Sequence, residues 1–295
     1  MKNSKTLLLL KISVFLIFIG RAWQHLFWDA PYRSFFWDEA LLKPLIEGFF
    51  TISWTEYVTS NQTDSFIQNS IRANGILYVI ASICSLSLTK NNKRWTRIPI
   101  FLGGISLLIL TTLLTKEKFY HVAQFFEHSI QFGLPFVLLY QHKDFDEKKH
   151  ILILKILIAV TFFSHGLYAF GFYPVPGKFV DMVIQIFGFS EPTAITFLYI
   201  AGILDFVLAV LIFIPKTAIY ALWYAIFWGL LTALARIVSN FHLEFPLNSI
   251  HQNLHETLYR IPHGLTPLIV LLLIKKHLYF TLKPFTVKVR NVLRF

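Results

Sequence analysis

Residues 193–214 have the sequence TAITFLYIAGILDFVLAVLIFI, in which Asp205 is the only charged side chain. A helix needs about 20 mostly apolar residues to cross the hydrocarbon core of a bilayer, so this stretch predicts a transmembrane helix. Similar runs recur along the chain. The predicted spans are residues 8–28, 67–89, 98–115, 122–141, 151–173, 193–214, 217–238 and 254–274. The sequence therefore predicts an all-α, polytopic membrane protein with about eight transmembrane helices.

The composition agrees with this class. Of the 295 residues, 55% are hydrophobic and 15% are charged, whereas a soluble domain carries about 25% charged residues. These values exclude a disordered chain, a collagen and an ordinary soluble enzyme. The formal net charge of +11 is explained by the Lys and Arg that collect in cytoplasmic loops, so nucleic acid is not expected as a partner. The single cysteine, Cys84, excludes an internal disulfide.

The distribution of Lys and Arg predicts the orientation. With the N-terminus inside, 17 of these residues fall in inner segments and 5 in outer segments. Because cytoplasmic loops are enriched in Lys and Arg, we expect both termini in the cytoplasm. The Asn, Lys, Ile and Phe richness suggests a bacterial chain, which predicts the inner, cytoplasmic membrane as the location.

The chain also predicts an internal repeat of two four-helix halves, residues 1–146 and 147–295. Corresponding positions in the halves carry related residues at matched spacings. These pairs are Lys11 and Lys155, Arg21 and His165, Gly75 and Gly202, His128 and Arg260, and Pro135 and Pro267. An even number of helices in each half predicts a parallel repeat.

Two segments outside the predicted spans differ between these halves. The first half has a long outer loop, residues 29–66, in which aromatic and acidic side chains are mixed as in amphipathic helices at a membrane interface. We expect this loop to form a small outer cap, with a lid over a site as the alternative. The second half ends in a basic tail that is predicted to be cytoplasmic.

Ionisable residues within spans predict the functional site, because charges in hydrocarbon are costly and usually serve a function. With the topology above, most of them fall in one layer near the outer leaflet. We assign candidate catalytic roles to Glu127, His128 and His165. Candidate ligand-binding residues are Arg21, His25, Arg72, Arg236, Glu256, Arg260 and His263.

This layer suits an anionic or semi-anionic head group, such as a quinone oxygen, a carboxylate or a phosphate. The alternative is structural, because Arg near a helix end also reaches lipid phosphate. No tight metal-ligand motif occurs, so no metal site is predicted, and haem ligated by two histidines is a minor alternative. We expect spans 1, 4, 5 and 8 to converge near the outer leaflet, with Arg21 and Arg260 as the candidate cationic partners of Glu127. The residues expected to meet there are Arg21, Glu127, His128, His165, Arg260 and His263.

The segment from Ile151 to about Ser239 resembles the DoxX-like family of small four-helix membrane proteins. The resemblance rests on short motifs in these spans and the segments between them. They are Leu154-Lys155-Ile156, Ser164-His165-Gly166-Leu167, the loop containing Gly188, Gly202-Ile203-Leu204-Asp205, and Lys216. The family's link with thiosulfate–quinone oxidoreduction implies quinone as a candidate cofactor.

A weaker resemblance connects aromatic-Trp-Asp stretches such as Phe36-Trp37-Asp38 with the membrane part of vitamin K-dependent carboxylase-like proteins. Three function classes therefore stay open. They are a quinone- or redox-linked membrane subunit with a soluble or membrane redox partner, a small-anion or lipid-head-group transporter or binder, and a structural or assembly factor without a ligand.

Overall fold

The computed structural model describes residues 4–89, 94–140 and 146–275. Within these ranges helices are the only regular secondary structure, and the described residues contain no strand. The helices are α1 (Ser4–Phe27), α2 (Arg33–Phe36), α3 (Glu39–Phe49), α4 (Trp54–Thr59), α5 (Asn61–Ser87), α6 (Arg94–Glu117), α7 (Val122–Phe126), α8 (Ser129–Tyr140), α9 (Glu147–Ala169), α10 (Gly177–Phe187), α11 (Glu191–Leu211), α12 (Ala218–Val238) and α13 (Pro246–Leu258). A turn at residues 259–261 separates α13 from helical residues 262–275.

Seven helical segments of the described chain are long and apolar enough to cross a membrane. They are α1, α5, α6, α9, α11, α12 and the segment Pro246–Lys275. The prediction of an all-α, polytopic membrane protein is confirmed. The predicted span at 122–141 is not one continuous helix, because it is divided into α7 and α8. The basic tail beyond Lys275, and Lys90, Lys93 and Lys143 of the predicted inner segments, lie outside the described residues.

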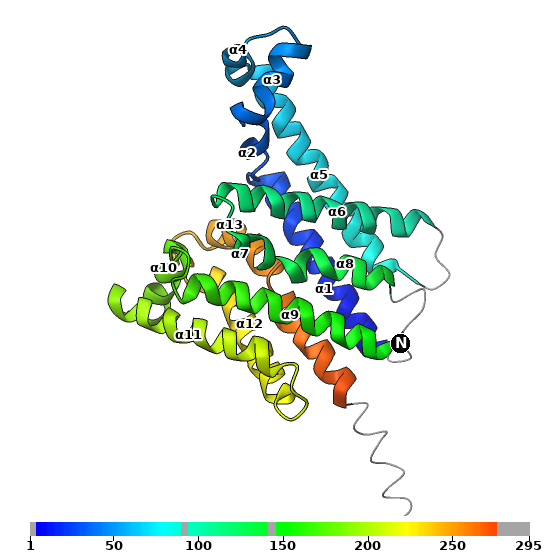
Figure 1. The fold of residues 1–295 in the computed structure, drawn as a ribbon, viewed down its shortest axis with the longest axis vertical. Helices are drawn as coiled ribbons and strands as arrows, with labels where there is room; N and C mark the ends of the chain where they lie inside the picture. Colours follow the sequence, from blue (N-terminus) through cyan, green and yellow to red (C-terminus); the bar gives the residue numbers. More distant parts are fainter. Residues whose placement is uncertain (1–3, 90–93, 141–145, 276–295) are drawn as a thin grey trace, which may run out of the picture.

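The two predicted halves pack in matching ways (Figure 1). The most extensive helix contacts join α1 to α5 in the first half and α9 to α11 in the second. Between the halves, α1 packs against α13, and α9 packs against α7 and α8. Each half thus places its first long helix against the last helices of the other half. The internal repeat itself stays a prediction.

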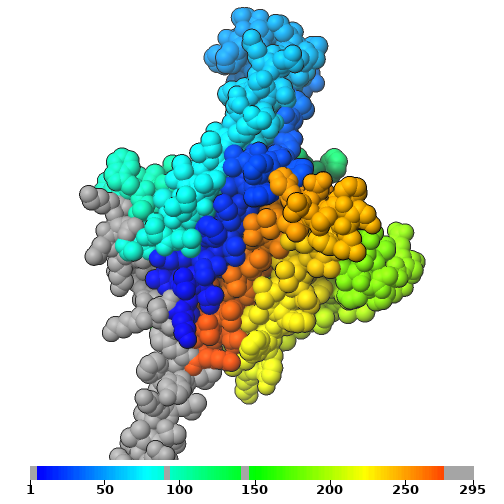
Figure 2. All heavy atoms as spheres, turned by 180° about the vertical axis from the view of Figure 1, so that it is seen from behind, coloured from blue at the N-terminus to red at the C-terminus, as the bar shows by residue number. Residues whose placement is uncertain are grey.

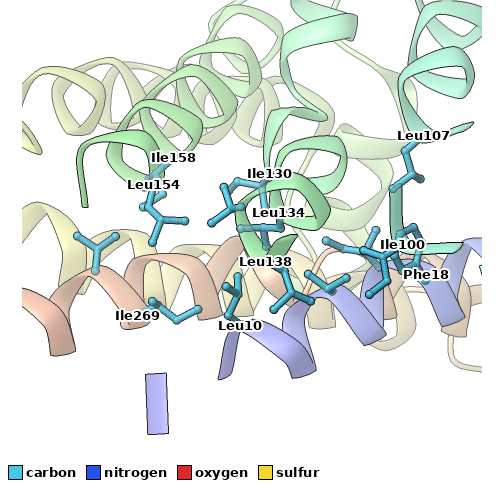
Figure 3. Packing of buried hydrophobic residues seen from close by; sticks show 14 of the residues in the cluster. Leu10, Phe18, Ile100, Leu107, Ile130, Leu134, Leu138, Leu154, Ile158 and Ile269 are labelled. Carbon is cyan, nitrogen blue, oxygen red and sulfur yellow. The ribbon is translucent and has the colours of Figure 1, made fainter. Parts of the chain in front are cut away.

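The interior of the bundle is apolar. Figure 3 shows Leu10 of α1 near Ile269, and Leu134 and Leu138 of α8 between α1 and α9. From behind, α1 and the helical residues that follow α13 lie side by side (Figure 2). Because lipid is as apolar as these side chains, van der Waals packing rather than exclusion from water stabilises such a contact.

Glycine brings α9 and α11 unusually close. A Cβ atom at Gly202 would lie 2.6 Å from the backbone nitrogen of Phe170 and 2.9 Å from the carbonyl oxygen of Gly166. Small residues permit this backbone approach between membrane helices. In the first half, Gly75 also lies at a helix contact, where an added Cβ atom would lie 2.9 Å from the Leu26 side chain of α1. The shared Gly-Ile-Leu sequence therefore marks a matching helix contact in each half.

The predicted outer loop at residues 29–66 forms the short helices α2, α3 and α4, which stand with the start of α5 beyond one end of the bundle (Figure 1). Leu42, Ile46 and Trp54 form a small separate core there. Asp38 caps α3 by accepting a hydrogen bond from the Leu41 backbone. The Asp38 carboxylate also pairs with Lys116 at 2.6 Å, which ties this extension to the end of α6.

Candidate functional site

Two of the membrane segments are interrupted at corresponding places. Glu127 and His128 separate α7 from α8, and the turn at residues 259–261 separates α13 from the helix that follows. Each break precedes a proline by the same spacing that the sequence shows. Pro135 lies inside α8, seven residues after His128, and Pro267 lies seven residues after Arg260. Interrupted helices at matching positions of two repeats are a recurrent feature of membrane binding sites.

The first break holds Glu127 against the second half of the bundle. Its Oε2 atom lies 3.4 Å from Nδ1 of His165 on α9, and its Oε1 atom accepts a hydrogen bond of 2.8 Å from the Gln124 amide. His128 is also near, with Nδ1 3.6 Å from Oε1. However, His128 Nδ1 lies 2.9 Å from the Gln124 carbonyl oxygen, which can only accept. His165 is therefore the better-placed proton partner of Glu127.

Arg21 occupies the corresponding place in the first half, but it meets no carboxylate. Its guanidinium donates to Gln131 Oε1 at 2.6 and 3.1 Å and to Gln24 at 2.8 Å. Its Cζ atom lies 3.9 Å from the centroid of the Tyr259 ring, which is close cation–π contact. The expected pairing of Glu127 with Arg21 or Arg260 is wrong. Within the described residues, the ion pairs of Glu127 are with His165 and His128, and two glutamines and a tyrosine contact Arg21.

Near the second break, Glu256 forms ion pairs with three cationic side chains. Its carboxylate oxygens lie 3.1 Å from Lys178 Nζ, 3.4 Å from Arg236 Nη1 and 4.0 Å from Arg260 Nη1. One carboxylate therefore faces three cations. Because these contacts leave positive charge in excess, the cluster is suited to a further anionic or electron-rich group.

His263 connects this cluster to His165. The two imidazole rings have centroids 5.7 Å apart, and His263 Nδ1 lies 2.8 Å from the Arg260 carbonyl oxygen. Since a carbonyl oxygen only accepts, Nδ1 carries the proton and Nε2 of the neutral ring is an acceptor. That Nε2 atom is buried and has no hydrogen-bond partner in the described structure.

Two of the predicted ligand-binding residues do not join this group. His25 is buried in the first half, where its ring packs edge-on against Tyr32 and Tyr78 and its Nδ1 lies 2.7 Å from the Arg21 carbonyl oxygen. Arg72 is exposed on α5, and none of the described ion pairs connects it to the other candidates. The remaining eight candidates lie around the two breaks and the ends of α1, α9 and α12.

A cavity of about 330 Å³ opens between α9, α10, α11 and α12. One part of its wall is polar and consists of His165, Arg236, Arg260 and His263. The rest is mainly aliphatic and aromatic, apart from Asp205. Glu127 and His128 do not line the cavity, so Glu127 stands behind His165. An apolar cavity with a few convergent polar groups is the usual form of a small-molecule site.

The sequence did not predict the contribution of α10 to this cavity. This helix begins after Pro176, and Gly188 ends it in the left-handed conformation with φ 68°. Phe179, Met182 and Val183 project from it into the cavity wall. Their spacing on one face of an 11-residue helix is a helical signal that the Pro and Gly residues at both ends obscured. The Arg236 guanidinium also lies 5.5 Å from the Phe179 ring.

Fold and site together define an all-helical, multi-pass membrane protein with a polar cluster at two interrupted helices. Residues 159–256 match the DoxX-like family, which confirms the resemblance seen in the second half. The match includes His165, Asp205, Arg236 and Glu256 but ends before the second break. No curated protein matches the chain, and no solved structure matches it. The resemblance to vitamin K-dependent carboxylases has no support from these comparisons.

Proposed function

We propose that this protein is a quinone-binding, redox-linked subunit of the bacterial inner membrane, with both termini in the cytoplasm. The observation that supports this proposal best is the cavity, where an apolar chamber adjoins two arginines and two histidines. A quinone has the same division, since its ring and tail are apolar and its carbonyl oxygens accept hydrogen bonds.

Free donors are available for those oxygens. Arg236 Nε and Arg260 Nη1 are buried and have no hydrogen-bond partner within the described structure. Leaving a buried donor unpaired costs about 1–3 kcal/mol, so a ligand that accepts from both arginines would recover this free energy. The ion pair with Glu256 fixes the position of the Arg236 guanidinium in the cavity wall.

The histidines supply a route for protons. Reduction of one quinone to the quinol consumes two electrons and two protons. His165 lines the cavity and is in contact with Glu127, so a proton can pass between the ligand and this pair. The electrons would come from a soluble or membrane redox protein that docks on this subunit.

A second candidate function is the binding of an anionic head group, such as a phosphate or carboxylate. The excess of cations around Glu256 favours it, because Lys178, Arg236 and Arg260 all face this one carboxylate. Anion binding would weaken steeply with salt at the exposed Lys178, whereas a neutral quinone would be almost insensitive to salt.

Ligand titrations on the purified, detergent-solubilised protein distinguish these functions. The probes are menadione as a quinone and decyl phosphate as an anionic amphiphile. We expect menadione to bind and the variants R236Q and R260Q each to weaken binding about tenfold, the effect of losing one hydrogen bond. R72Q is the matched control, since Arg72 is exposed and outside the cluster.

Each outcome of these titrations identifies one function. Preferential, salt-sensitive binding of decyl phosphate would support the anion-binding function instead. Binding of neither probe by a folded protein would contradict both proposals and favour an assembly factor. Equal menadione affinities of R236Q and R72Q would show that the quinone does not use this site.

A further inference from the structure

Asp205 is a further polar residue of the cavity wall and lies on a different helix from the arginines. It lies on α11, its residue is 3% exposed, and it contributes to the cavity wall. The Tyr224 hydroxyl donates to its Oδ1 atom at 3.5 Å. None of the described salt bridges includes Asp205. A carboxylate without a cation is costly in hydrocarbon, so its place in the cavity wall needs an explanation.

The location of Asp205 follows from the helices around it. On α11, the neighbouring Ile203, Leu204 and Val207 are exposed on the outside of the bundle, whereas Asp205 faces inward. Its neighbour Trp228 on α12 lies eight residues before Arg236, which is about 12 Å along a helix axis. The cavity therefore has an acidic end and a basic end, with an apolar chamber between them.

The first half has a different side chain at the position that corresponds to Asp205. Tyr78 follows Gly75-Ile76-Leu77 exactly as Asp205 follows Gly202-Ile203-Leu204. Tyr78 is fully buried, and its hydroxyl is hydrogen-bonded to Ser106 at 2.8 Å.

The position before the glycine contact differs in size as well. The predicted repeat pairs Lys11 with Lys155 and Arg21 with His165, so His25 and Ala169 are counterparts. A histidine and a tyrosine thus fill the interior of the first half, where the second half has an alanine and an aspartate. At these two positions the side chains of the second half leave space and add a carboxyl group.

We propose that Asp205 binds the far end of the ligand, so that the cavity selects molecules with hydrogen-bond acceptors on both sides of a ring. A protonated carboxyl group donates to such an acceptor, and Tyr224 holds it in place. This inference rests on the proposed quinone function and extends it, because a para-quinone has two opposed carbonyl oxygens and a lipid head group has a single polar end. Asp205 is then a specificity-determining residue.

The test compares menadione, which has two opposed carbonyl oxygens, with tetralone, a bicyclic ketone that has one. Both are titrated into the purified full-length protein and into the variants D205L and D205N. We expect D205L to weaken menadione binding about tenfold and tetralone binding less than about twofold. D205N keeps a donor at this position and should recover most of the menadione affinity.

The outcomes separate this inference from the proposal on which it rests. If menadione binds to the unaltered protein but D205L binds it equally well, the role of Asp205 is overturned and the quinone function stands. If D205L weakens both probes alike, Asp205 shapes the cavity without selecting the second acceptor, and the inference fails. If menadione does not bind to the unaltered protein, the quinone function falls and this inference falls with it. Thermal unfolding of D205L and D205N, measured in parallel, shows whether each variant is folded.

Discussion

Glu127 and Tyr259 occupy corresponding places in the two halves of the bundle. Each immediately precedes the polar residue that lies seven positions before a proline, and each lies at the break of an interrupted helix. Each also contacts the first long helix of the other half: Glu127 lies 3.4 Å from His165, and the Tyr259 ring lies 3.9 Å from Arg21. The same geometry therefore holds an acid–imidazole pair on one side and a cation–π pair on the other.

This relationship predicts a pH dependence that depends on Glu127. When the pair of His165 and Glu127 binds a further proton, the imidazole becomes a donor to a ligand oxygen, so menadione affinity should rise as the pH falls. E127Q removes the acidic partner and should flatten this profile. Titrations of menadione over a range of pH check this outcome.

H128A is the matched control for E127Q. His128 Nδ1 is engaged by the Gln124 carbonyl, and His128 does not line the cavity, so this variant should keep the pH profile. Loss of the profile in H128A together with its retention in E127Q would assign the proton role to His128 instead.

The glycine contact between α9 and α11 predicts a stability difference. In G202A the new methyl group would meet the Phe170 backbone nitrogen at 2.6 Å, and backbone cannot turn away as a side chain can. We expect overpacking to destabilise the protein by about 1–3 kcal/mol. G48A is the control, because no atom lies within 4 Å of a Cβ added at Gly48. Thermal unfolding in detergent should show a lower midpoint for G202A alone, and equal midpoints would disprove the close packing.

The outer extension should loosen in acid. The Lys116 ammonium, 2.6 Å away, holds the pKa of the Asp38 carboxyl below its ordinary value, and the Leu41 backbone donor acts in the same direction. A carboxyl whose pKa is lower in the folded state stabilises that state fully above about pH 4. This stabilisation is lost as the pH falls through the lowered pKa.

Hydrogen exchange of α3 measures this effect. We expect α3 amides to exchange faster as the pH falls below the ordinary pKa of aspartate, after correction for the intrinsic exchange rate. K116M should exchange faster already at neutral pH and show a smaller pH step. K43M, which removes the exposed pair of Lys43 with Glu39, should behave like the unaltered protein; an equal effect of K43M would count against a specific anchor at Asp38.

The membrane orientation is tested with reporter fusions. The charge distribution predicts that reporters at Asn92 and Lys148 are cytoplasmic and that reporters at Asn61 and Asn248 are periplasmic. Alkaline phosphatase activity, which requires export, should therefore appear only at the second pair. The reverse pattern at two or more of these sites would contradict the orientation.

The spans could be predicted because the length of a continuous apolar run can be read from the sequence alone. Continuous runs such as 193–214 need no tertiary information, and the seven long segments are found where hydropathy places them. The break at Glu127 and His128 could not be predicted in this way. A hydropathy window averages over the polar pair, so α7 and α8 merge into one apparent span. The spacing to Pro135 was the available signal.

The sequence predicted which residues belong to the candidate site, but not which of them contact one another. Burial of charge in a membrane segment identified Glu127, His165 and Arg236 as candidates, since such residues need partners. Opposite charge suggested Arg21 as the partner of Glu127, yet Gln131 contacts Arg21 because helix rotation decides which side chains meet. The cavity itself depends on small side chains such as Ala169, which carry no chemical signal in the sequence.

The central claim is that the cavity of the second half holds a quinone. The most direct measurement is mass spectrometry of solvent extracts from the protein purified in mild detergent, compared with the variant A169H. Ala169 lines the cavity, and histidine is the residue found at its counterpart in the filled first half. We predict stoichiometric quinone in the unaltered protein and little in A169H, with both proteins folded. No quinone in the unaltered protein, or equal amounts in both, would contradict the account.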